Sequence, residues 1–189
     1  MACSILNTMN LDCMSALGGV NTIYVFAGAN FDPQTVVAGE VALTGVGGGN
    51  FYQYKFGKDT AKLTETATIS NANGTVFYTQ ELSVNITKRD VTKRNEFLLL
   101  AKNREIRVIV LDNMGQYWLL GNERGAVLST MVGEGGQAIG DMNGYTFTFQ
   151  AMEGNPMPVL SAVDASAISA IAPGTTALVG GFTFNTSTN

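Results

Sequence analysis

The residue types most often used in catalysis are scarce in this sequence. Its 189 residues include no histidine, which removes the commonest general base and the commonest metal ligand. Cys3 and Cys13 are the only cysteines, and no histidine is present to activate either thiol. Two reduced thiols are one interpretation and a disulfide between them is the other. The sequence predicts no enzyme, with no catalytic, cofactor-binding or metal-binding residues and no cofactor.

Two further kinds of chemistry have candidates in the sequence: glycoside hydrolysis by paired carboxylates, and phosphate binding by glycine-rich loops. Glu65 with Glu81, or Asp112 with Glu123, could lie on neighbouring strands as acid pairs for glycoside hydrolysis, but nothing in the sequence marks a cleft. The glycines of 45–49 precede a strand-like run rather than a helix, so a phosphate site would lack its helix N-terminus. The glycines of 133–136 lack the Gly-Lys-Ser/Thr of a phosphate loop. Both glycine clusters are interpreted as hairpin tips.

Alternation with a period of two residues dominates the chain and predicts strands. Apolar and polar residues alternate over 82–87 and again over 145–150, and threonines share one face of 64–68. The turn at Asn73-Gly74 is expected to join strands near 62–70 and 75–87. The run 106–111 is apolar on both faces except at Arg107, so it is expected in the middle of the structure.

One segment has the features of a helix. Val91–Lys102 contains neither Gly nor Pro, and Asp90 can cap its N-terminus. Val91, Arg94, Leu98 and Ala101 recur at helical spacing, which predicts the buried face. Asn103 could end the helix in a left-handed conformation. A second, short helix is expected at 164–172, capped by Asp164.

These elements predict a mainly β protein, a β-sandwich or open barrel with one flanking α-helix at about Val91–Lys102. Residues 1–152 are expected to form the β-sandwich domain. Within it, residues 28–50 contain several glycines and are expected to project as a long hairpin or loop. Residues 153–189 contain three of the four prolines and are interpreted as a C-terminal arm or extension.

The composition indicates a protein that assembles. The chain is 46% hydrophobic but only 14% charged, whereas soluble domains carry about 25% charged residues. No apolar stretch approaches the roughly 20 residues of a membrane span, so no membrane partner is expected. A surface so poor in charge is expected to be covered by other copies of the same chain.

The basic residues are concentrated in one stretch. Seven of the eleven lysines and arginines lie between residues 88 and 107, while the flanking segments carry mainly acids. A solvated basic helix is one interpretation, and contact with the acidic surface of a neighbouring subunit is the other.

Candidate residues for a subunit interface combine aromatic and apolar side chains with two members of the basic stretch. They are Phe31, Val36, Val37, Phe51, Tyr52, Lys93, Arg94, Phe182 and Phe184. Aromatic residues are enriched at interfaces, although core packing on strands is the alternative for them.

Several short runs, taken in their order, carry a resemblance to a known family. They are Asp12-Cys13, Gly18-Gly19-Val20, Ile23-Tyr24, Thr64-Glu65-Thr66, Asn73-Gly74-Thr75, Tyr78-Thr79-Gln80-Glu81-Leu82, Lys93-Arg94-Asn95-Glu96, Tyr117-Trp118-Leu119-Leu120-Gly121 and Gly144-Tyr145-Thr146-Phe147-Thr148-Phe149. Over roughly residues 1–152 the chain resembles structural proteins of the virions of tailed bacteriophages and prophages of Bacteroidetes-type hosts, and tail tube proteins most of all.

The resemblance implies a self-assembling tail tube subunit. Such proteins form rings, expected here to be hexameric, whose inner strands join into a barrel, and the rings stack into a conduit for DNA. The implied partners are further copies of the chain, other tail or connector proteins, and double-stranded DNA that passes through without specific binding. The implied location is the virion tail, with the host cytoplasm during assembly. A head-to-tail adaptor or tail-terminator ring is the alternative, and a carbohydrate-binding β-sandwich module is the second alternative.

Overall fold

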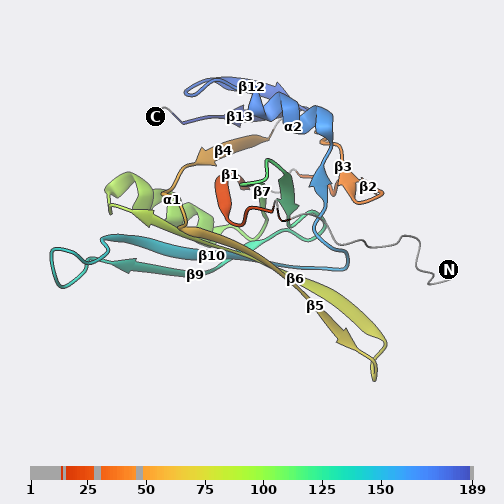
Figure 1. The fold of residues 1–189 in the computed structure, drawn as a ribbon, viewed down its shortest axis with the longest axis horizontal. Coiled ribbons are helices and arrows are strands. Elements are labelled where there is room, and N and C mark those ends of the chain that lie inside the picture. Colours follow the sequence, from red (N-terminus) through yellow and green to blue (C-terminus); the bar gives the residue numbers. More distant parts are fainter. Residues whose placement is uncertain (1–13, 15, 28–30, 46–48, 188–189) are drawn as a thin grey trace.

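The strands form two sheets, with helices packed beside them, and the sheets contain the strands predicted near 62–70, 75–87, 106–111 and 145–150 (Figure 1). The structure is a computed structural model, and it describes residues 14, 16–27, 31–45 and 49–187. The larger sheet contains β1 (Val20–Ala27), β2 (Val36–Val37), β3 (Glu40–Val41), β4 (Asn50–Tyr54), β7 (Ile106–Asp112), β8 (Tyr117–Leu120), β11 (Val159–Leu160), β12 (Thr176–Val179) and β13 (Phe182–Asn185). The smaller contains β5 (Ala61–Ser70), β6 (Thr75–Thr87), β9 (Val127–Glu134) and β10 (Gly144–Glu153). The helices are α1 (Val91–Lys102) and α2 (Ala162–Ser169).

The nine-stranded sheet curls into an open half-barrel and is buried on both faces at its centre. On β1, Ile23 and Val25 face the four-stranded sheet, while Tyr24 and Phe26 face the inside of the half-barrel. The neighbouring strand β7 divides its apolar residues in the same way. This confirms that 106–111 lies in the middle of the structure, and even Arg107 there is only 2% exposed.

The four-stranded sheet closes the sandwich. Its order is β5-β6-β10-β9, and its central pair aligns Val84 with Phe147 and Leu82 with Phe149. These side chains pack with β1, β7 and α1 in one apolar cluster. The alternation predicted over 82–87 and 145–150 is therefore confirmed, as is the mainly β class with a flanking helix.

Helix α1 has the predicted bounds but not the predicted buried face. The Asp90 side chain accepts a hydrogen bond from the Lys93 backbone N–H at 2.8 Å, which confirms the cap. Phe97 and Leu100 are the buried residues of the helix, whereas Val91 and Leu98 are 72% and 49% exposed. The expected buried line was wrong because Phe97 packs against Tyr145 and Phe147 and so fixes which side faces the sheets.

Two further expectations about helix ends were wrong. Asn103 follows α1 in an extended conformation, with φ of −87°, and not in a left-handed one. Helix α2 begins two residues earlier than predicted and is capped by Ser161. Asp164 instead uses its carboxylate to accept a hydrogen bond from the Leu43 N–H at 2.9 Å, which ties α2 to the segment after β3.

The element that projects is the β5–β6 hairpin and not the 28–50 segment (Figure 1). In the described part of that segment Phe31, Val41 and Leu43 are buried inside the half-barrel, because their apolar side chains fill the space above β1. At the hairpin, Ile69 and Val76 pair across the strands but are 66% and 50% exposed. The hairpin thus extends the apolar sheet face past the core.

The C-terminal residues belong to the fold and are not a free arm. Strand β13 adds to the nine-stranded sheet by parallel pairing with β4, which aligns Phe184 with Phe51. Helix α2 packs nearby and buries Ile168 in the same half-barrel (Figure 1). The expectation of an appended arm fails because these apolar side chains complete a second core.

Candidate assembly surface

The outer face of the four-stranded sheet is mainly polar and carries few charges. Side chains that alternate with the core residues point to this face, and strand pairing aligns Thr64 with Glu81 and Thr148 with Ser83. We call it the polar sheet face; its members are Lys62, Thr64, Thr66, Thr68, Ser70, Thr75, Phe77, Thr79, Glu81, Ser83, Asn85, Thr87, Val127, Thr130, Val132, Glu134, Thr146, Thr148, Gln150 and Met152. Gln150 Nε2 donates to Glu81 Oε1 at 2.7 Å, so an amide covers this carboxylate. Hydroxyls and amides are the most numerous groups on the face, which also carries four exposed apolar side chains, Phe77, Val127, Val132 and Met152. Its charged members are Lys62, Glu81 and Glu134.

Both edges of the same sheet are long and unpaired within the described part of the chain. β5 has 10 residues and pairs only with β6, and β9 has 8 residues and pairs only with β10. Proteins normally protect such edges with Pro, Lys or very short strands. Neither strand contains Pro, and Lys62 is their only lysine. These edges are suited to pairing with strands of another molecule.

The edges of the nine-stranded sheet are different. Its outermost strands are β12, with 4 residues, and β2, with 2 residues. Strands this short offer few backbone groups for pairing. The extended edges available for assembly therefore belong to β5 and β9.

Four of the predicted interface residues are buried in the half-barrel and cannot contact a second subunit there. Phe31, Phe51, Phe182 and Phe184 are at most 3% exposed. Phe51 stacks on Phe184 with ring centroids 4.8 Å apart, and Phe31 stacks on Phe182 at 5.2 Å. The interface prediction for these four was wrong because the aromatic rings fill the core of their own chain.

The other five predicted interface residues lie at or near the surface. Val37 and Tyr52 are 70% and 52% exposed, and Val36 is 40% exposed. Arg94 is exposed on α1. Lys93 is partly covered, since its Nζ donates to the carbonyls of Thr87 and Lys88 at 2.7 and 2.9 Å. Lys93 therefore stabilises the start of its own helix, while the remaining four are accessible.

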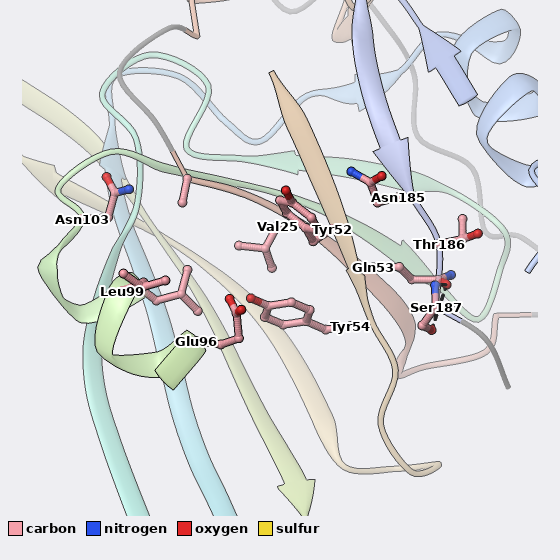
Figure 2. A pocket seen from close by; sticks show the side chains of 12 residues that line it. Val25, Tyr52, Gln53, Tyr54, Glu96, Leu99, Asn103, Asn185, Thr186 and Ser187 are labelled. Atoms are coloured by element: carbon pink, nitrogen blue, oxygen red, sulfur yellow. Dashed lines mark hydrogen bonds between the residues drawn. The ribbon is translucent and has the colours of Figure 1, made fainter. Parts of the chain in front are cut away.

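A cavity of about 670 Å³ lies between β4, α1 and the end of the chain after β13 (Figure 2). Tyr54 and Glu96 point toward one another at its wall, and burial together with this carboxylate raises the pKa of Tyr54. Gln53 Oε1 accepts from the Ser187 N–H at 3.1 Å, which closes one side. Sequence reasoning missed this site because its walls come from three distant segments.

The candidate acid pairs do not come together. Glu65 lies opposite Gln80 while Glu81 lies opposite Thr64, so the two glutamates point to opposite faces of the sheet. Asp112 accepts from Trp118 Nε1 at 2.9 Å at one end of the β7–β8 hairpin. Glu123 follows the other end and accepts from Asn155 Nδ2. These carboxylates make structural hydrogen bonds.

The described residues contain neither a metal-binding cluster nor a membrane-spanning helix. No group of three or more His, Cys, Asp or Glu side chains could hold a metal ion among them, and Cys3 and Cys13 lie outside them. None of the helices within these ranges has the length and apolar character that crossing a membrane requires. The most exposed aromatics, Tyr52 and Phe77, lie on different sheets, and no aromatic row of a carbohydrate-binding face is seen among the residues described.

The described glycines of the 45–49 run serve close packing, so the interpretation as a hairpin tip was wrong for them. A Cβ on Gly49 would collide with the ring of Phe26. Gly45 donates to the Gly180 carbonyl at 2.6 Å, and a Cβ there would press on the Gly181 backbone. Glycine at these positions lets two backbone segments approach.

Sequence reasoning did not predict that Arg107 of β7 lies near a second buried charged residue, Glu153 of β10. Arg107 lies with its guanidinium carbon 5.1 Å from the centroid of the Phe31 ring, and its Nη1 is 3.8 Å from Glu105. Nearby, the Glu153 carboxylate accepts from the Arg124 N–H at 3.0 Å and is 3% exposed. Burial raises the pKa of Glu153 and lowers that of Arg107.

The Glu153 shift predicts how stability depends on pH. The folded chain binds this proton more tightly than the unfolded chain, so the contribution of Glu153 to stability falls as the pH rises from its ordinary pKa of 4.5 through the raised value. Glu153→Gln keeps an acceptor for the Arg124 N–H but does not ionise. Urea unfolding of both proteins between pH 4 and pH 8 should show the variant gaining stability relative to the wild type as the pH rises. If the difference in free energy of unfolding between the two proteins were the same from pH 4 to pH 8, the raised pKa of Glu153 would be contradicted.

No protein-family model, curated protein or solved structure matches the chain.

Proposed function

We propose that this protein is a self-assembling structural subunit of a bacteriophage virion, a tail tube protein whose rings stack into a conduit for DNA. One observation carries the proposal. The four-stranded sheet buries one face in the core, presents a mainly polar face on the other side, and has two long edges that no other described strand pairs with. Pairing β5 of one copy with β9 of the next continues the sheet from subunit to subunit.

Such pairing is a heterologous contact, which closes into a ring when the rotation per subunit permits. Six copies contributing four strands each would give a barrel of 24 strands. With strands about 4.8 Å apart and tilted about 40°, its backbone diameter is about 48 Å. Inward side chains take about 10 Å of this width. The remaining space accommodates a DNA duplex.

The chemistry of the polar sheet face suits such a channel wall. Lysines and arginines on the wall would pair with the phosphates, and the duplex would then bind to the channel and not pass through freely. Among the described residues of this face Lys62 is the single cation, and the carboxylates are Glu81 and Glu134. Threonine, serine and amide side chains keep the wall hydrated and carry no charge that would attract the phosphates of the duplex. DNA is accordingly a passing partner without specific binding, and the other partners are further copies and neighbouring tail or connector proteins.

Electron microscopy of the purified full-length protein, with light scattering on the same sample, tests the proposal. We expect hollow rings that stack into tubes. A monomer that stays dispersed at high concentration would contradict it. The copy number in purified virions distinguishes the related roles, because many copies per particle indicate a tube, and six or twelve indicate an adaptor or terminator ring in the virion tail.

A further inference from the structure

The outward side of α1 carries apolar and basic residues together. Val91, Arg94, Leu98 and Lys102 follow one another at helical spacing and are exposed, with Val91 72% and Leu98 49% accessible. The ion pairs among the described residues are Lys93–Asp90 and Arg107–Glu105, so Arg94 and Lys102 have no carboxylate partner there. We call these four residues the helix stripe. An exposed apolar pair between unpaired cations is unusual for a surface that faces only water.

A second exposed apolar patch is flanked by acids. Val36 and Val37 of β2 are 40% and 70% exposed, and Val37 pairs across the strands with Glu40 of β3. Val36 and Glu123 line the same shallow surface depression. Both Glu40 and Glu123 are exposed. Neither glutamate enters an ion pair among the described residues. We call Val36, Val37, Glu40 and Glu123 the acidic corner.

The two patches lie at opposite ends of the molecule. Helix α1 is at one end of the long axis and the β2–β3 pair is at the other (Figure 1). They cannot meet within one chain, but one copy can present its helix stripe to the acidic corner of the next. This geometry is head-to-tail, so the contact can repeat without limit.

We propose that the helix stripe binds the acidic corner of a second copy, and that this contact joins successive rings of the assembly. The inference rests on the proposed function and names the surfaces that stack. Opposite charges flank apolar residues on both patches, which gives attraction and register to the contact. If two helix stripes met, four unpaired cations would come together, and if two acidic corners met, four carboxylates would come together. Charge repulsion therefore opposes both symmetric pairings.

The test uses charge reversal with a matched control. Arg94→Glu places a carboxylate in the stripe, Glu40→Lys places a cation in the corner, and Lys58→Glu changes the net charge as Arg94→Glu does, at an exposed turn outside both patches. We expect Arg94→Glu and Glu40→Lys each to raise the critical concentration for tube assembly by about tenfold or more at low salt, where charge pairs act most strongly. Lys58→Glu should assemble as the wild type does, and circular dichroism should show all three variants folded.

Rescue identifies the occupant of the stripe. In an equimolar mixture of the Arg94→Glu and Glu40→Lys proteins, each stripe can meet a corner of opposite charge in alternating copies, so tubes should form again. The double variant on one chain should assemble as well. Loss of assembly without rescue would show that the stripe binds another surface or a different acidic protein, and would overturn the proposal. Normal tubes from Arg94→Glu would also overturn it while leaving the proposed function intact, whereas a wild type that forms no rings or tubes defeats the proposed function itself.

Discussion

Replacing Phe184 by alanine is expected to lower the free energy of unfolding by about 3–5 kcal/mol. The Phe184 ring is fully buried and stacks on Phe51 at 4.8 Å with an interplanar angle of 7°. It also meets the edge of Tyr24 with centroids 5.7 Å apart. Removing the ring leaves a cavity between β13 and the centre of the nine-stranded sheet. Denaturant unfolding, at dilutions where assembly does not add to stability, measures the loss.

Leu178→Ala is the matched control for this prediction. Leu178 lies on β12, next to β13, but is 74% exposed, so its truncation should change the free energy of unfolding by less than about 0.5 kcal/mol. A Phe184→Ala protein with an unchanged unfolding midpoint would show that the C-terminal strands are a detachable arm. By the same reasoning, deleting 153–189 should prevent folding rather than only block polymerisation.

A disulfide between β5 and β9 of neighbouring copies is expected to produce a covalent ladder of multimers. Thr66 and Thr130 are exposed and lie on opposite edge strands. In one chain β6 and β10 separate these strands, which places them about 14 Å apart, whereas a disulfide needs Cα atoms within about 7 Å. Cysteines at 66 and 130 can therefore link only between copies. Denaturing electrophoresis after mild oxidation of the assembled protein shows the products.

The design needs three controls. Cys3 and Cys13 are replaced by serine so that every link involves the introduced thiols. A second pair, with cysteine at Val132 in place of Thr130, allows for a different register between strands. Cysteines at 66 and 178 place one thiol on an edge of each sheet and should give no ladder. If neither β5–β9 pair forms more than trace dimers while the protein is assembled, subunits do not join through these edges.

Local pattern was sufficient to predict β5, β6, β7 and β10 and the main helix, but it did not predict β1 or the edge strand β9. Alternation over 82–87 and 145–150 reflects one buried face, and Asn73-Gly74 supplies the positive φ, 62° at Gly74, that its turn requires. Asp90 could be identified as a cap because it precedes a run without Gly or Pro. These features depend on neighbours in sequence, which is why reading the chain locally finds them.

The second core could not be predicted in the same way. Phe51 and Phe184 meet through parallel pairing of β4 with β13, and no local pattern specifies which distant strand completes a sheet. Without that pairing, exposed and buried aromatics look alike, and Phe31 and Phe182 were assigned to an interface. The exposed side of α1 was likewise hidden, because Leu98 looks like a core residue until Phe97 is seen against Tyr145.

A three-dimensional reconstruction of the assembled particles by electron microscopy would show how the subunits join. We expect β5 of each subunit to pair with β9 of its neighbour, and Thr64, Ser83 and Thr148 to face the lumen. Particles in which this sheet faces outward, or in which both edges remain unpaired, would contradict it.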